Sequence, residues 1–132
     1  MIDPRIIGTW RLRSTKAVDD AGNVLPPPYS ATPAGVAVFD RNGRMFALLC
    51  DGRPEMPAGE PRPLMAYTGR YTFDGTTLLT YPDASSESGR LGTEQVRTVR
   101  FENGGMTLVP PRRLFAGVMQ HQELFWEQVS DK

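Results

Sequence analysis

Turns that pair glycine with a polar residue divide this chain into short segments, and they limit its possible folds more than any other feature. The chain has 13 glycines and 12 prolines among 132 residues, and the segments between them are rich in Thr, Val, Tyr, Phe and Arg. Such segments are typical of β-strands, and Asn-Gly or Asp-Gly between two of them predicts a tight hairpin. Hairpins are predicted at Asn42-Gly43, Asp74-Gly75 and Asn103-Gly104-Gly105. The chain is therefore predicted to be all-β.

Eight sequential antiparallel strands can close into an up-and-down barrel, which leaves no open edge and encloses side chains or one small ligand. A two-sheet sandwich is the alternative, and regular hairpin spacing favours the barrel. Asp3-Pro4 predicts one N-terminal helical turn that ends before Gly8, and residues 1–132 are expected to form one domain. The eight predicted strands are Thr9–Val18, Gly35–Asp40, Arg44–Cys50, Met65–Phe73, Thr76–Tyr81, Glu94–Glu102, Met106–Pro110 and Val118–Val129.

The composition of the chain narrows the classes of molecule that it is expected to bind. Lys plus Arg and Asp plus Glu each number 15, so no net charge favours nucleic acid or an anionic membrane. Cys50 is the only cysteine, which excludes an internal disulfide and suits a reducing cytoplasm. The sequence has no signal-peptide pattern, membrane-length apolar stretch, zinc pattern or nucleotide-binding loop. We expect a cytoplasmic protein without metal or cofactor, whose partner is a small hydrophobic molecule or a second copy of the chain.

Six short segments, in the same order along nearly the whole chain, resemble those of the bacterial lipocalin-like domain proteins. The resemblance implies an eight-stranded lipocalin-like barrel in which an N-terminal turn closes one end. It also implies that Trp10 packs at that closed end as a structural residue. The segments are Gly8–Leu12, Asp40–Met45, Ala66–Tyr71, Gly92–Arg97, Leu108–Pro111 and Trp126–Glu127.

The chain departs from these relatives in two places. Many members have histidines where this chain has Thr80 and Tyr81, so no histidine-dependent activity is carried over. Many also have a helical insert where this chain has the Pro-rich segment Asp51–Leu64. We expect this segment and the Pro-rich Asp19–Thr32 to rim the barrel mouth, and the Ser- and Gly-rich segment Pro82–Gly92 to be a mobile loop.

Alternation along two strands selects candidate ligand-binding residues, because residues two apart share a face. An aromatic stripe on Met65–Phe73 and an apolar stripe that ends at Phe101 should both face inward, and tyrosine hydroxyls could bind a ligand carbonyl. The candidate ligand-binding residues are Tyr67, Tyr71, Tyr81, Gln95, Arg97 and Phe101.

Arg97 is the charged member of this set, and an inward guanidinium is costly unless it is paired. Its partner could be Glu123, a tyrosine hydroxyl, or a carboxylate or enolate of a ligand. The first partner would make Arg97 part of an internal ion pair. The last would make it a polar anchor for an otherwise apolar ligand.

The last strand has two possible inward faces. One carries His121 and Glu123, which could act together as a general base near neutral pH. The other carries Gln122, Leu124 and Trp126, and the tryptophan favours it. With Tyr71, His121 and Glu123 are the candidate catalytic residues, and the sequence leaves the inward face open.

Three functions fit these observations. The first is binding of a small, mainly apolar molecule in the lumen. The second is a small barrel enzyme, a cyclase, isomerase or dehydratase, that acts on a hydrophobic metabolite by acid/base chemistry. The third is a filled barrel that acts through its surface or as a dimer. A cavity of at least about 300 Å³ is expected for the first two functions and not for the third.

Overall fold

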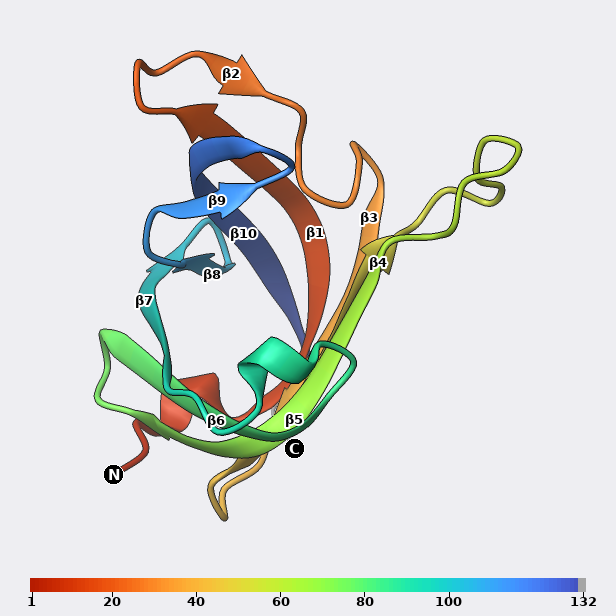
Figure 1. Cartoon of the computed structure of the whole chain (residues 1–132). Helices are drawn as coiled ribbons and strands as arrows, with labels where there is room; N and C mark the ends of the chain where they lie inside the picture. Colours follow the sequence, from red (N-terminus) through yellow and green to blue (C-terminus); the bar gives the residue numbers. More distant parts are fainter. Residues whose placement is uncertain (131–132) are drawn as a thin grey trace.

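The protein is a closed antiparallel β-barrel in its computed structural model, which describes residues 1–130 (Figure 1). Each of the eight wall strands pairs with the next, and the last pairs with the first, so the predicted up-and-down barrel is confirmed. No helix among the described residues is long and apolar enough to cross a membrane. The wall strands are β1 (Gly8–Asp19), β3 (Pro33–Phe39), β4 (Arg44–Asp51), β5 (Leu64–Phe73), β6 (Thr77–Ser85), β7 (Gln95–Glu102), β8 (Gly105–Val109) and β10 (Val118–Ser130).

The predicted hairpins form, and aspartate side chains shape two of them. Oδ1 of Asp40 accepts hydrogen bonds from the backbone N–H groups of Asn42 and Arg44, both at 2.9 Å. Oδ1 of Asp74 does the same for Thr76 and Thr77, at 2.9 and 2.7 Å. This is the usual way in which aspartate favours a turn, since its side chain replaces a backbone acceptor.

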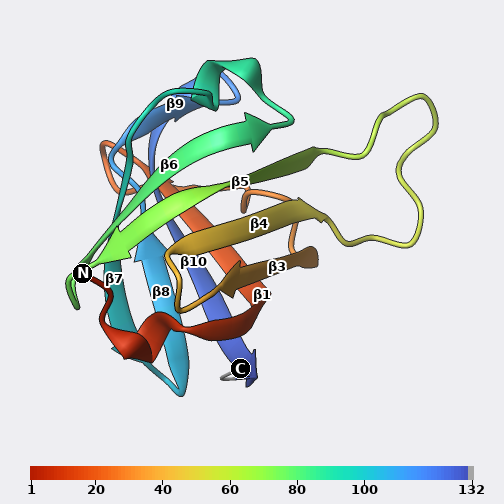
Figure 2. The same cartoon turned by 90° about the horizontal axis from the view of Figure 1, so that it is seen from below.

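One end of the barrel is closed by the N-terminal turn η1 (Pro4–Ile6), which Asp3 caps as the sequence predicts (Figure 2). Ile6 of this turn is fully buried, and its carbonyl accepts a hydrogen bond of 2.9 Å from Nε1 of Trp10. Phe73 and Met106 are fully buried in the same core. Trp10 therefore has the structural place that the resemblance implied.

A register shift between Thr68 and Gly69 lets β5 and β6 stay paired beyond the predicted strand end. The backbones approach so closely here that a Cβ on Gly69 would lie 2.1 Å from the carbonyl oxygen of Tyr81. Strand β6 therefore continues to Ser85, and the 3₁₀ turn η2 (Ser88–Arg90) follows. The prediction that the whole of Pro82–Gly92 forms a loop is wrong, because the missing side chain of Gly69 allows the extra pairing.

Two short strands extend the sheet beyond the prediction. Strand β2 (Val24–Leu25) pairs with β1 through a turn in which Oδ1 of Asp19 accepts from the N–H of Asn23 at 2.8 Å. Strand β9 (Arg113–Phe115) pairs with β10 through Ala116 and Gly117, which have φ angles of 51° and 81°. The second turn escapes prediction because alanine is an unusual residue in this conformation.

The Pro-rich connection between β4 and β5, residues 52–63, projects away from the barrel as a long arm (Figures 1 and 2). It does not rim the mouth as predicted. Only the other Pro-rich connection reaches the mouth, where Tyr29 lines the interior.

Replacing Trp10 by phenylalanine should lower the free energy of unfolding by about 1–3 kcal/mol, because the hydrogen bond to Ile6 and part of the buried volume are lost. Urea unfolding followed by circular dichroism measures the change. Val24→Ala is the control, since Val24 is 86 % exposed, and it should change stability by less than about 0.5 kcal/mol. Equal stability of Trp10→Phe and the native protein would show that Trp10 does not hold the closed end.

Candidate functional site

A cavity of about 80 Å³ lies inside the barrel, between the core that fills the closed end and the open end. It is smaller than the roughly 300 Å³ expected for a ligand pocket, yet larger than the roughly 10–15 Å³ that one water needs. The interior is thus neither a large pocket nor fully packed. Most of its wall is apolar and comes from the inward faces of six strands: Ala37, Phe39, Met45, Ala47, Leu49, Met65, Leu78, Leu108, Leu124 and Trp126.

Charged side chains line the cavity at its mouth, where η2 and β9 lie opposite the closed end (Figure 2). Arg90 comes from η2, Arg97 from β7 and Arg113 from β9, and Glu87 lies immediately before η2. We call these four residues the mouth cluster. The cluster therefore joins three guanidinium groups and one carboxylate from distant parts of the chain.

Arg90 is the arginine of the mouth cluster that is paired with a carboxylate. Its Nε donates to Oε2 of Glu87 at 3.0 Å, and its Nη1 donates to Oε1 of Gln95 at 2.7 Å. The guanidinium also lies 5.6 Å above the centre of the Tyr67 ring, as in a cation–π contact. These contacts use the one carboxylate that the mouth cluster contains.

Arg97 and Arg113 have no carboxylate partner among residues 1–130. Arg97 donates only to neutral oxygens, the carbonyl of Val96 at 2.8 Å and Oε1 of Gln95 at 3.3 Å. Burial lowers the pKa of the Arg97 guanidinium, although an arginine stays charged at neutral pH. Arg113 has a ring contact with Phe115, whose centre lies 5.9 Å from its guanidinium carbon. The mouth therefore carries positive charge that no carboxylate of residues 1–130 pairs with.

Of the predicted ligand-binding residues, Tyr67 and Arg97 line the cavity. Gln95 lies beside them, but its carbonyl oxygen already accepts from two arginines, so it positions them. Phe101 packs against Phe73 at the closed end, with ring centres 6.0 Å apart, and does not line the cavity.

Tyr71 also belongs to the closed end and not to the cavity. Its hydroxyl donates a hydrogen bond of 2.6 Å to the carbonyl of Asp40, and its ring meets Phe39 edge to face. Burial raises the pKa of Tyr71 to about 12. This hydroxyl therefore supports the β3–β4 hairpin and is poorly suited to acid/base chemistry at neutral pH.

Tyr81 lies on the outer face of the barrel, contrary to the prediction that its hydroxyl reaches the lumen. The hydroxyl donates to Oε2 of the exposed Glu94 at 3.0 Å, and the guanidinium of Arg70 lies over the ring. Tyr81 is opposite Arg70 in the β5–β6 register, and cross-strand partners share a face of the sheet. Its neighbour Thr80 points inward and is fully buried.

Strand β10 turns Gln122, Leu124 and Trp126 inward, which answers the question that the sequence left open. His121 and Glu123 lie on the outer face. Nε2 of His121 is 3.1 Å from Oδ1 of Asp20, and Glu123 bonds Arg100 at 2.8 Å and lies 3.6 Å from Lys16. None of the three candidate catalytic residues therefore lines the cavity.

Two buried polar atoms in the barrel have no hydrogen-bond partner among the described residues. They are Nε1 of Trp126, whose side chain lines the cavity, and Oγ1 of Thr80. A buried donor without a partner costs about 1–3 kcal/mol. In contrast, Gln122 donates to Gln120 at 3.1 Å, and Gln120 donates to the carbonyl of Phe115 at 3.0 Å. Trp126 thus offers a free donor in an otherwise apolar wall.

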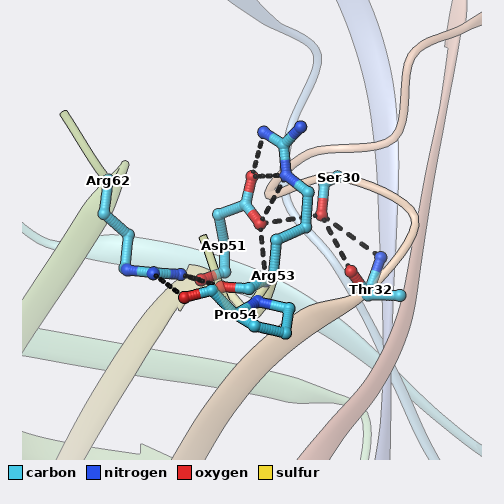
Figure 3. A network of polar contacts seen from close by, with 6 residues as sticks. All are labelled: Ser30, Thr32, Asp51, Arg53, Pro54 and Arg62. Carbon is cyan, nitrogen blue, oxygen red and sulfur yellow. Dashed lines mark hydrogen bonds and ion pairs between the residues drawn. The ribbon is translucent and has the colours of Figure 1, made fainter. Parts of the chain in front are cut away.

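A polar network around Asp51 holds the rim beside the mouth (Figure 3). The Asp51 side chain is 3 % exposed and forms a two-oxygen contact with Arg53, the shortest at 2.7 Å. It also accepts from the Ser30 hydroxyl at 3.1 Å. Arg62 donates to the carbonyls of Asp51 and Arg53, both at 2.6 Å. The network therefore joins the base of the arm to the loop that precedes β3.

That loop carries Tyr29 over the mouth in an unfavourable backbone conformation. Tyr29 and Ser30 have φ angles of 62° and 70°, and such residues cost about 1–3 kcal/mol each unless the surroundings hold them. The Asp51–Ser30 hydrogen bond and a hydrogen bond from Thr15 to the carbonyl of Pro28 supply that support. Burial raises the pKa of the Tyr29 hydroxyl. Tyr29 is thus a positioned wall of the cavity.

Sequence reasoning missed Tyr29, Arg90 and Arg113. Arg90 lies in a segment predicted to be a loop, and Arg113 follows two prolines in a strand that was not predicted. The adjacent Arg112 points elsewhere and bonds Asp20 at 2.7 Å. A pair of arginines after the seventh predicted strand indicates that one could face inward, but only the fold shows which.

A family model described as a lipocalin-like domain matches residues 7–129. The match covers the mouth cluster and all eight wall strands, apart from the last residue of β10. No curated protein matches the chain in sequence.

Asp51→Asn should destabilise the protein at neutral pH, and the effect should vanish in acid. Hydrogen bonds from Arg53 lower the pKa of Asp51 from 3.8 to about 2. A carboxylate with a lowered folded-state pKa stabilises the fold above its unfolded pKa, and this is lost as the pH falls through the folded value. The difference in unfolding free energy between native and variant protein should therefore shrink between about pH 4 and pH 2.

Urea unfolding at a series of pH values measures that difference. Asp83→Asn is the matched control, because Asp83 forms an exposed ion pair with Arg44 and should contribute little. A pH-independent difference for Asp51→Asn would mean that the network stabilises the rim by shape and not by the carboxylate charge.

Proposed function

The chain belongs to the lipocalin-like domain family, and we propose that its barrel binds a small, mainly apolar molecule in the cavity. The observation that carries this proposal is the division of the cavity wall, which is apolar in its depth and charged only at the mouth. Small-molecule sites commonly combine an apolar wall with a few polar groups that orient the ligand. A barrel filled only for stability would have no need of three arginines at its opening.

The size of the cavity limits the ligand. A space of about 80 Å³ holds about five to eight water-sized groups, which fits a short alkyl chain or one ring. Met45, Met65 and Leu49 line this space, and methionine adapts readily to ligands of different shape. A molecule of this size, with its polar end at the mouth, is the ligand that the cavity supports best.

Purification from the native host tests the proposal most directly. Native mass spectrometry of the protein, followed by extraction, should reveal a small, mainly apolar molecule that remains bound. An empty barrel that also fails to bind hexanol in the titration below would count against a lumen-binding function.

Ala47→Leu should weaken hexanol binding by at least about tenfold, because the larger side chain occupies part of the cavity. The readout is the indole N–H signal of Trp126 in a proton–nitrogen correlation spectrum, assigned by its loss in Trp126→Phe. The second tryptophan, Trp10, lies at the closed end and should not respond. Ala84→Leu adds the same group to an exposed position of β6 and should leave hexanol binding unchanged.

A further inference from the structure

The mouth cluster holds three guanidinium groups and one carboxylate, and this excess of positive charge bears on the chemistry of the ligand. Glu87 is bonded to Arg90 and remains 52 % exposed, whereas the Arg90 side chain is only 10 % exposed. Arg97 and Arg113 have no carboxylate partner in the described part of the chain. Both arginines are partly buried, and a cation that loses part of its hydration is stabilised by a nearby anion, so these two arginines favour an anion from outside the protein.

The internal ion pair that the sequence left open for Arg97 does not form. Glu123 lies on the outer face of β10 and bonds Arg100 at 2.8 Å. Gln95 cannot replace it, because its one carbonyl oxygen is neutral and is shared between Arg90 and Arg97. A guanidinium has five N–H donors, and two hydrogen bonds are found for Arg97. Donors therefore remain for a ligand.

The same three arginines also line a hollow of about 460 Å³ on the outer surface, whose other charged residues are Arg112, Glu87 and Glu94. The three arginines thus stand where the apolar cavity meets a polar surface. A ligand that enters tail first would leave its head group among them. Its apolar part would lie in the cavity and its charged part would remain near water, so neither would be buried in the wrong surroundings.

We propose that the ligand is a small apolar carboxylic acid, bound as its anion, whose carboxylate lies between Arg97 and Arg113. This inference rests on the proposed lumen-binding function and specifies the ligand for that site. Planar guanidinium groups match the two oxygens of a carboxylate, which gives directional hydrogen bonds as well as charge. Arg90 supports the site from the side through Gln95. An amine of the same length would be repelled by the arginines.

Hexanoate, hexanol and hexylamine share one alkyl chain and differ in the head group, so they separate the two proposals. Titrations follow the indole N–H signal of Trp126, with that of Trp10 as the internal control. Hexanoate should bind at least about tenfold more tightly than hexanol, since a charge-assisted hydrogen bond contributes about 1.5–3 kcal/mol. Hexylamine should bind more weakly than hexanol.

Substitutions test whether Arg97 and Arg113 bind the carboxylate. Arg97→Gln and Arg113→Gln should each weaken hexanoate binding by at least about tenfold while leaving hexanol binding within about twofold. Arg100→Gln is the matched control, because Arg100 lies on the same strand, bonds Glu123 on the outer face and lines neither the cavity nor the hollow, and it should change neither affinity. Circular dichroism and hexanol binding together show that a variant remains folded with its cavity intact.

The failures of the two proposals are distinguishable. Binding of hexanol and hexanoate with equal affinity, unaffected by Arg97→Gln, would overturn the proposal that the ligand is a carboxylic acid. The lumen-binding function would remain. Absence of any binding by both compounds would overturn the lumen-binding function and the carboxylate with it. Tighter binding of hexyl phosphate than of hexanoate would also overturn the assignment, because it would make the arginines a phosphate site.

Discussion

The pairing of β10 with β1 is the interaction on which the remainder of the structure depends. It runs from Thr9 opposite Ser130 to Asp19 opposite Gln120, and it turns an open sheet into a closed wall. Once the wall is closed, every strand must send alternate side chains inward, where water is scarce. Arg97 lines the mouth because of this rule, since it shares its inward face with the buried Val99.

Local signals predict much of this barrel. Aspartate and glycine turns mark the hairpins, and the aromatic stripe of β5 and the apolar stripe of β7 give the correct inward faces. The pairing register between neighbouring strands predicts which way a side chain faces better than alternation within one strand does. The Asp74-Gly75 turn places Tyr81 opposite Arg70. Arg70 alternates with the inward aromatic residues of β5 and so faces outward, and hairpin pairing then indicates that Tyr81 faces outward too. The prediction that Tyr81 lines the lumen did not take its cross-strand partner Arg70 into account.

The candidate site is less predictable because its parts meet only after closure. Arg90, Arg97 and Arg113 come from η2, β7 and β9, and nothing in their local sequence distinguishes them from Arg100 or Arg112, which form ion pairs outside the cavity. Tyr29 depends on the still more distant Asp51, whose contact with Ser30 holds a backbone conformation unfavourable for a tyrosine. Contacts of this kind follow from the fold and not from a motif.

The mouth also shows how such a barrel can favour binding at the expense of stability. Arg97 is held in place by neutral oxygens, and the buried indole N–H of Trp126 has no hydrogen-bond partner within residues 1–130. Both features lower the stability of the barrel without a ligand, because buried polar groups are costly when unpaired. A bound anion would remove the first cost, and Arg97 is already held beside the cavity by Val96 and Gln95. Preorganisation of this kind favours affinity, because the protein loses little further freedom when the ligand arrives.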